Sequence, residues 1–583
     1  METKTAKYSL IKRTKKWVIP HYKTFALCLF LLLIASLIKI LGPVIIQQAV
    51  DGPIKNKDIP SLVLLLGGYI VILLIGYFAN YQEIVRLETV GQSIVAEIKK
   101  SVFKHLLTLN MSYFDKTTTG NLVSRVENDS NAMLVLFTTI ITNFIGSVTL
   151  LIGMLCVMFF KYSSVLAFSL LAFIPFMLGS AILFGKNIAP KLINIRKYVA
   201  DVNSYITEII QGISIIQIFG QEKRVLNELK IRSKKKYDAE KVTTVMFNTF
   251  FNLLFFVNIL GTVIVLYIGT DMVLKKTMTI GGLILFINFI SQFFMPIIQL
   301  SGQFSEFQRG FAGAIRVFDL LDTENTIPDT NNPVEIPNKE KGINIEFKNV
   351  WFKYVEDGEW ILKDVSFYCP TGQTWAIVGP TGSGKTTIIS LLLKFYSPQK
   401  GEILLNGVNI DNISKAELRN ILGLVLQENI LFPGTIYENL TLRQSNYSDE
   451  QVKILMEDLG INPVISKLQK GYQTELNDNA SNLSSGEKQL ISFGRALLKN
   501  PYILVFDEAT SNIDPEIENN IKLAMNNLVK GRTALIIAHR LSTIQSADKI
   551  MVLKDGHLIE IGNHQELIKF GGFYSQLNML QVG

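Results

Sequence analysis

The sequence predicts an α-helical membrane domain of six spans with long cytoplasmic helical extensions, followed by a soluble α/β domain. Of its 583 residues, 48% are hydrophobic and only 18% charged, whereas soluble domains usually carry about a quarter charged residues. Nearly all of the apolar excess lies before Gly310. From Ile343 onward, short β-branched runs alternate with helical stretches, which is typical of an α/β domain.

Six apolar runs are long enough to cross a bilayer as helices, each needing about 20 residues. They cover residues 25–50, 61–80, 134–160, 163–185, 247–274 and 280–300. Two of the connections between them, 81–133 and 186–246, are long and rich in Lys and Arg, and the others are short. Because Lys and Arg concentrate on the cytoplasmic side, we expect the long connections, the basic N-terminus and the C-terminal half in the cytoplasm of a cell membrane.

The long connections contain few helix breakers, so we expect them to continue the membrane helices. Brief interruptions occur at residues 115–120 and 211–213. The polar run 322–342 contains Pro328, Pro333 and Pro337 and is typical of a linker. The predicted domains are therefore residues 1–321 in the membrane, a linker at 322–342, and a soluble domain at 343–583.

The net charge of +8 does not require a nucleic-acid partner, and we predict none, because many basic residues lie in segments that the positive-inside bias explains. Cys28, Cys156 and Cys369 are isolated, which predicts neither a disulfide framework nor a zinc site. The first apolar run is long and lacks a small-residue cleavage site, so we expect a retained anchor.

The segment Gly379-x4-Gly384-Lys385-Thr386 fits the Walker A pattern. A strand-like run enters it and a helix-like run leaves it, which argues against a glycine turn that binds nothing. We expect the backbone N–H groups to wrap ATP phosphates, Lys385 to reach the β- and γ-phosphates, and the Thr386 hydroxyl to hold Mg²⁺. The expected nucleotide contacts in this loop are Gly379, Thr381, Gly382, Ser383, Gly384, Lys385, Thr386 and Thr387.

Further candidates follow apolar strands. Asp507 ends the run 503–506, where a carboxylate would orient the metal, and Glu508 is expected to polarise the attacking water, although alone it could be a surface carboxylate. His539 follows the strand 533–538, which should lie beside the P-loop strand, so we expect it to contact the γ-phosphate rather than serve structure alone. Gln427, after the run 421–426, is a further candidate for a metal or water contact.

An aromatic residue ahead of the P-loop can stack on adenine. Tyr354, in Val350-Trp-Phe-Lys-Tyr354, is the candidate, with core packing as the alternative. Trp351 and Phe352 are expected in the core.

The order Tyr354, Walker A, Gln427, Leu483-Ser-Ser-Gly-Glu487, Asp507-Glu508, Asp514, His539 resembles the ABC ATPases. With six spans before it, the whole chain resembles a half-transporter of the ABC exporter family. The resemblance implies an ATP hydrolase coupled to transport, working as a dimer in which ATP lies between one Walker A loop and the partner's signature segment. It implies that the signature residues Ser484, Gly486 and Glu487 meet ATP bound to the partner. It also implies that the interruptions at 115–120 and 211–213 are coupling helices.

Departures from the family pattern point to an asymmetric dimer. The usual signature is Leu-Ser-Gly-Gly-Gln, whereas this chain has Ser485 and Glu487, and residues 474–480 lack the usual glycines although Asp478 keeps an acid. In these features, and in the run 507–514, the chain resembles the intact-glutamate chain of heterodimeric bacterial multidrug exporters. A homodimer that tolerates both variants is the alternative.

The cargo is less well marked. The last two spans carry Phe residues interleaved with amides; these are Phe247, Phe250, Phe251, Phe255, Phe256, Phe286, Phe289, Phe293 and Phe294. Such walls suit hydrophobic or amphipathic compounds, although Phe can equally face lipid. Lys39 is the one basic residue deep within a predicted span, and it can also snorkel.

We therefore predict ATP-driven export of hydrophobic or amphipathic compounds by alternating access. The alternatives are a lipid flippase, a peptide exporter, and an ATP-gated channel or regulatory subunit. Peptide exporters often carry an extra N-terminal protease domain, and we expect no such domain ahead of residue 25 here. The six spans exclude a soluble ATPase of the same superfamily.

Overall fold

The computed structural model describes residues 13–161, 168, 173–325, 327, 329–330, 332–426, 429–444, 447–466, 468–477, 480–507, 515–538 and 544–582. The chain divides into two compact units. The first comprises Met1–Leu107 with Thr119–Thr323, and the second comprises Thr108–Thr118 with Glu324–Gly583. The segment Thr108–Thr118 thus lies with the C-terminal unit although it comes from the N-terminal part of the sequence. The domain limits expected at 321/322 and 342/343 stay predictions.

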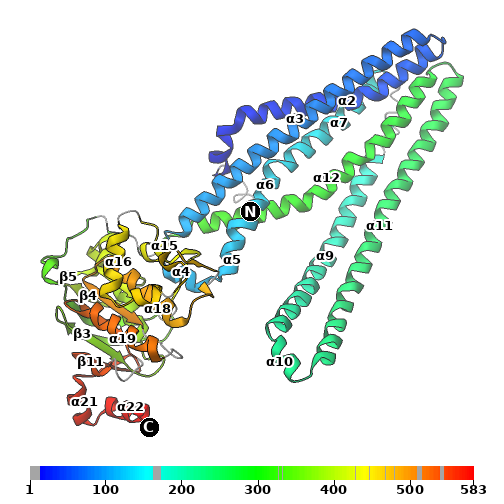
Figure 1. The fold of residues 1–583 in the computed structure, drawn as a ribbon. Helices are drawn as coiled ribbons and strands as arrows, with labels where there is room; N and C mark the ends of the chain where they lie inside the picture. Colours follow the sequence, from blue (N-terminus) through cyan, green and yellow to red (C-terminus); the bar gives the residue numbers. More distant parts are fainter. Residues whose placement is uncertain are drawn as a thin grey trace. The chain divides into compact units, whose positions relative to one another are not determined.

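The first unit is helical in its described part (Figure 1). Its elements are η1 (Ile19–His21), α2 (Tyr22–Ala49), η2 (Val50–Ile54), α3 (Ile59–Leu106), α5 (Thr119–Ser124), η3 (Arg125–Asp129), α6 (Ser130–Phe137), α7 (Thr139–Lys161), α9 (Phe173–Gln211), α10 (Ile213–Ile218), α11 (Glu222–Leu274) and α12 (Ile280–Leu321). Helices α3 and α11 contain 48 and 53 residues, more than twice the length that a bilayer requires. The expectation of long helical extensions is met in both.

Four described helical stretches are long and apolar enough to cross a membrane: Arg13–Ile54, Ile59–Leu106, Thr119–Phe160 and Glu222–Leu274. A shorter apolar stretch, Ile280–Gln292, begins α12, where the sixth span was expected. The expected fourth span, 163–185, lies partly outside the described residues and continues into α9. Side-chain caps fix two helix starts, because Asp58 accepts from Ser61 N ahead of α3 and Thr279 accepts from Gly282 N ahead of α12.

The expected wall of Phe residues differs in burial along its length: Phe247 and Phe250 are partly buried, and the side chains of Phe293 and Phe294 lie outside the described residues. Phe286 and Phe289 on α12 are fully buried and pack with Met154, Met158 and neighbouring apolar residues. Phe251, Phe255 and Phe256 on α11 are exposed. Helix packing therefore accounts for the α12 pair, and the α11 group remains available to lipid, cargo or a partner.

Helices α9 and α11 form a long hairpin joined by α10 (Figure 1). The short α10 coincides with the interruption expected at 211–213. The end of the hairpin is apolar and exposed: the exposed fractions of Ile213, Ile215, Ile218 and Phe219 are 46–78%. We name these four residues the hairpin tip.

The second unit is an α/β domain built on two larger sheets and a two-stranded one. The antiparallel sheet has the order β2 (Leu362–Cys369), β1 (Ile345–Phe352), β4 (Lys400–Leu405), β5 (Val408–Asn409); the second has the order β12 (His557–Gly562), β11 (Lys549–Lys554), β3 (Thr374–Val378), β10 (Thr533–Ile537), β9 (Ile503–Asp507), β6 (Leu422–Val425); β7 (Gly434–Thr435) pairs with β8 (Glu475–Leu476). The helical elements are α4 (Met111–Lys116), η4 (Lys339–Lys341), α13 (Lys385–Leu392), η5 (Ile410–Asn412), α14 (Lys415–Ile421), α15 (Ile436–Thr441), α16 (Asp449–Asp458), α17 (Asn462–Ser466), η6 (Gly471–Gln473), α18 (Ser485–Leu498), α19 (Pro515–Val529), α21 (His564–Phe570) and α22 (Phe573–Val582).

Parallel pairing brings the predicted site segments to one edge of the six-stranded sheet. Strand β10 pairs with β3 on one side and β9 on the other, with Ile537 opposite both Ile377 and Asp507. The expectation that the strand before His539 lies beside the P-loop strand is therefore confirmed. Because ligands of parallel α/β sheets bind at the carboxyl ends of strands, this edge is the candidate site.

Candidate nucleotide site

The loop between β3 and α13 requires glycine. Gly379 has φ +154, and a Cβ there would lie 2.2 Å from the backbone oxygen of Leu553. Gly384 has φ +101, and a Cβ there would lie 2.6 Å from Leu362 Cδ2. Gly382, at φ +84, has open space around it. The loop backbone is therefore held close to its own domain on one side and is exposed on the other, as a phosphate cradle requires.

The Lys385 ammonium is turned into this loop. Its Nζ donates to the carbonyl oxygens of Gly379, at 2.8 Å, and of Pro380, at 2.9 Å. Burial lowers the pKa of Lys385, and the Asp507 carboxylate opposes that shift. A buried cation held by two neutral carbonyls at a glycine loop is placed to exchange them for phosphate oxygens, to which charged hydrogen bonds are stronger.

Neighbouring groups fit a bound metal–phosphate group. The Ser383 hydroxyl is buried and, within the described part of the chain, has no hydrogen-bond partner. Thr386, on the first turn of α13, is exposed, and Asp507 lies two strands away at the end of β9. Hydroxyl and carboxylate oxygens are the ligands that Mg²⁺ prefers, so these residues fit that ion.

The expected catalytic residues Glu508 and His539 lie outside the described residues, as do Gln427, Asp478 and Asp514. Their strands are described, and both β9 and β10 end at the same sheet edge as the P-loop. The roles assigned to these residues remain predictions.

Tyr354 is 44% exposed and lies against the P-loop helix. Its hydroxyl is 3.1 Å from Thr387 Oγ1, and its ring meets Tyr396 edge to face at 5.0 Å. Phe352, two residues earlier, is buried, as expected, whereas Trp351 is only partly buried. An exposed ring held beside the P-loop remains available for adenine.

Tyr396 was not anticipated from the sequence. It contacts both Tyr354 and Phe352, and its hydroxyl donates a hydrogen bond to Asp115 in the segment Thr108–Thr118. The same segment is joined to the domain by a 2.8 Å bond from Asn325 Nδ2 to Thr108 O. A network therefore runs from Thr387 through the two tyrosines to the first predicted coupling segment. The only sequence signal was an aromatic residue shortly after the P-loop helix.

The signature segment begins α18 with a capping box. The Ser484 hydroxyl accepts from Glu487 N at 3.3 Å, and the Glu487 carboxylate accepts from Ser484 N at 2.7 Å. Ser484 and Ser485 are exposed, and Gly486 is buried. The carboxylate of Glu487, which the family resemblance places at ATP bound to the partner, is engaged here with its own backbone, because a Ser-x-x-Glu sequence favours this cap.

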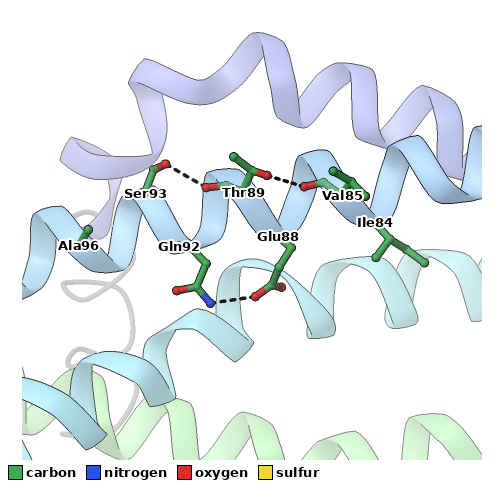
Figure 2. Close-up of a pocket in the computed structure, with 7 residues that line it drawn as sticks. All are labelled: Ile84, Val85, Glu88, Thr89, Gln92, Ser93 and Ala96. Atoms are coloured by element: carbon green, nitrogen blue, oxygen red, sulfur yellow. Dashed lines mark hydrogen bonds between the residues drawn. The ribbon is translucent and has the colours of Figure 1, made fainter.

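A hollow of about 700 Å³ lies on the first unit and is lined by α3 alone (Figure 2). Its polar side chains bond within the helix: Thr89 to Val85 O at 2.7 Å, Ser93 to Thr89 O at 2.9 Å, and Gln92 to Glu88 at 2.9 Å. The hollow is therefore an open face of α3 on which the hydrogen bonds of Thr89, Gln92 and Ser93 stay within the helix.

Comparison with known proteins agrees with both units. Residues 25–297 match the ABC transporter transmembrane region, and residues 362–511 match the ABC transporter family. The chain is 37% identical, over 97% of its length and 93% of the relative's, to the uncharacterized ABC transporter ATP-binding protein YfiC of Bacillus subtilis. It is 35% identical to the probable multidrug resistance ABC transporter ATP-binding/permease protein YheH of the same organism, covering 91% and 78% of the two chains.

Two further similarities concern cargo and fold. The chain is 30% identical to the ATP-dependent lipid A-core flippase of Syntrophus aciditrophicus, covering 98% and 94% of the two chains. A solved bacterial Atm1-family ABC exporter with ATP bound matches with a TM-score of 0.77 and 25% identity, covering 97% of this chain and 99% of that one. The chain therefore belongs to the ABC exporter family, as a half-transporter that joins a membrane-spanning helical unit to an ATP-hydrolysing ABC domain.

Proposed function

We propose that this chain is one half of an ATP-driven exporter of hydrophobic or amphipathic compounds in the cytoplasmic membrane. The ATP-binding unit and the N-terminus face the cytoplasm. The observation that carries the proposal is the glycine-restricted loop with the buried Lys385, built into the same chain as long apolar helices. Relatives named as a multidrug transporter and as a lipid flippase support an apolar cargo.

The residues of the nucleotide site divide the work. Lys385 and the loop N–H groups hold the β- and γ-phosphates of ATP, and Tyr354 stacks on its adenine. Thr386, Asp507 and Gln427 hold Mg²⁺, which when bound neutralises charge on the phosphate oxygens. Glu508 orients the attacking water and accepts its proton, and His539 contacts the γ-phosphate.

Movement reaches the membrane unit through the coupling segments. The contacts of Tyr396 with Tyr354 and Asp115 support the first segment as one of them. The hairpin tip supports the second, because four exposed apolar residues, three on the short helix α10 and Phe219 directly after it, suit a partner surface. ATP shifts the equilibrium only if it binds the closed dimer more tightly than the open one.

We further propose that the partner is a different half-transporter. Ser485 is exposed at the start of α18, and the cap there forms without glycine. The serine in place of the usual signature glycine therefore weakens the binding of ATP held by the partner, and it costs little in folding. This chain then supplies the strong site's Walker A loop, Glu508 and His539, and its signature closes the weak site. In the homodimer alternative, two identical sites would both work with Ser485.

The test is to tag this chain in its own cell membrane, purify it gently and identify the bound subunits. A second half-transporter at equal stoichiometry supports the heterodimer, whereas this chain alone with full substrate-stimulated ATPase activity would refute it. The purified complex is then placed in lipid vesicles with either a fluorescent amphipathic cation or a labelled lipid. ATP-driven transport of the dye without lipid movement supports drug export, and the reverse result supports the flippase.

A further inference from the structure

The last turns of α12 are held by an ion pair to a distant part of the first unit. Arg316 Nε donates to Asp129 Oδ2 at 2.9 Å, and its Nη2 donates to Asp129 Oδ1 at 2.5 Å. Asp129 is only 6% exposed, whereas the Arg316 side chain is half exposed. Two-pronged Arg–carboxylate contacts fix orientation as well as supplying energy.

A π-helical turn presents Asp129 to this contact. The turn, η3, spans Arg125–Asp129 between the ordinary helices α5 and α6. Within it, Glu127 faces the other way and accepts from Lys99 of α3 at 2.7 Å. Such turns insert a residue into a helix and are frequent at functional positions. The turn thus lets one short segment contact α3 through the Glu127 carboxylate and α12 through the Asp129 carboxylate.

The backbones of η3, α6 and α12 also touch. A Cβ on Gly313 would lie 2.9 Å from Asp129 O, and a Cβ on Gly310 would lie 2.8 Å from Ala132 O. The ion pair therefore lies where the helices approach too closely for larger side chains. A small slide of α12 along this contact would strain both the glycines and the ion pair.

Further contacts hold the end of α12. Arg13 donates to both oxygens of Asp322, at 2.5 and 2.6 Å, and lies over the Phe318 ring at 4.3 Å. His105, at the end of α3, is 3.1 Å from Thr323 O. The chain passes between the two units after Leu107, before Thr119 and after Thr323. Within the first unit, His105 thus joins the end of α3 to the end of α12, and the pair of Asp129 and Arg316 joins the segment after Thr119 to α12. All three places where the chain passes between the units are therefore connected.

We propose that Asp129 and Arg316 are positioning residues for energy coupling. They lock the continuous helical segment of α5, η3 and α6, which starts at Thr119, to the end of α12, so that a displacement of the segment Thr108–Thr118 moves α12 as well. This inference rests on the proposed transport function. Without the pair, ATP is still hydrolysed, but its energy no longer reaches the transport helices.

The experiment uses the complex with its partner, in lipid vesicles with an amphipathic cationic dye. Asp129→Asn, Arg316→Gln and the double variant are compared for basal ATPase activity and for dye moved per ATP. We expect basal activity to stay within about twofold, and dye moved per ATP to fall about tenfold, as for the loss of a typical coupling free energy. The double variant matters most, because it leaves no unpaired buried charge to destabilise the fold.

Glu306→Gln is the matched control, since it breaks an exposed pair with Arg309 within the same helix and should change neither quantity. A double variant that transports like the natural complex overturns the proposal. So does a transport loss that only follows a lower unfolding temperature. The exchange Asp129→Arg with Arg316→Asp should recover part of the coupling.

A separate readout distinguishes failure of the proposed cargo. Spin labels at residues 55 and 276, both in short connections, report an ATP-induced distance change without any cargo. If the natural complex moves no dye but changes this distance, the cargo is wrong and the coupling proposal is still tested. The Asp129 and Arg316 variants should then lose the distance change, and its full retention would overturn the proposal.

Discussion

Two helix starts in the second unit, one after the Walker A loop and one at the signature segment, are built in opposite ways. Helix α13 begins after Gly384, in the left-handed region, and no side chain caps it. Helix α18 begins with Ser484, whose hydroxyl and the Glu487 carboxylate complete a capping box. The first N–H groups of a helix need partners. No side chain accepts from these groups at the start of α13, whereas at α18 the Ser484 hydroxyl accepts from Glu487 N.

The same contrast governs which substitutions each start can tolerate. Around α13, glycines have positive φ and little or no room for a Cβ at Gly379 and Gly384. At the start of α18, Ser485 and its neighbour Ser484 are exposed. The P-loop glycines are therefore restricted by contacts within their own domain, whereas Ser484 and Ser485 of the signature are not. If the proposed weak site lies at this signature, the exposed position of Ser485 means that it carries little cost to folding.

The largest expected effect tests the chemistry beside the P-loop. Glu508→Gln should reduce steady-state ATP hydrolysis by the complex roughly 100-fold or more, because a general base contributes about 10²–10⁴ in rate. ATP binding should remain, giving a dimer trapped closed. Hydrolysis rate and nucleotide retention by the purified complex check both statements. Unchanged turnover would remove Glu508 from its assigned role.

Gly379→Ala tests the claim that the domain itself restricts the P-loop. Its Cβ would meet Leu553 O, so we expect a loss of about 3 kcal/mol in the free energy of unfolding, measured without nucleotide. Gly382→Ala is the matched control, because it adds the same methyl group at positive φ into open space and should cost about 1 kcal/mol. Equal losses would mean that backbone strain alone matters.

Lys385→Ala tests whether the open helix start binds phosphate. Removing one charged hydrogen-bond donor of this kind costs roughly 1.5–3 kcal/mol, so ATP affinity at this site should fall about 10- to 100-fold. Titration with a fluorescent ATP analogue measures the change. Lys394→Ala, at a buried lysine that bonds loop carbonyls outside the P-loop, controls for general loss of folding.

Glu487→Ala tests the closed helix start. Loss of its half of the capping box should reduce the free energy of unfolding by about 1 kcal/mol. Glu487→Gln should keep the cap, since an amide oxygen can accept the same bond, and should leave stability nearly unchanged. Thermal unfolding of the two variants decides, and equal destabilisation would show that the charge rather than the cap is what matters.

The smallest effect on folding is expected for Ser485→Gly. A helix-terminal, exposed serine should change stability by only a few tenths of a kcal/mol. If Ser485 instead hinders the approach of ATP bound to the partner, Ser485→Gly should raise ATP turnover at the weak site although stability hardly changes. Separate counting of the two sites, with Glu508→Gln silencing one of them, measures this rise. A large stability loss with no gain in turnover would break the comparison.

Local patterns in the sequence were sufficient for much of this architecture. Apolar runs of bilayer length, the breaks at 115–120 and 211–213, and the Walker A spacing each depend on residues close together in the chain. The long helices α3 and α11, the short α10 and the strand–loop–helix around Lys385 appear where these patterns place them. The capping box is equally local, and the Ser-x-x-Glu pattern from Ser484 to Glu487 is a sufficient signal for it.

Contacts between distant residues could not be predicted in this way. No sequence pattern pairs Tyr396 with Asp115, or Arg316 with Asp129, because the members of each pair are more than 180 residues apart and meet only on folding. It also could not divide the Phe residues into the buried Phe286 and Phe289 and the exposed group on α11. Sequence by itself determined which chemistry the chain carries and where its helices run, because both depend on short-range spacing. Only the tertiary structure decided which side chains are buried and which carboxylate meets which cation, because burial and long-range pairing are properties of packed elements.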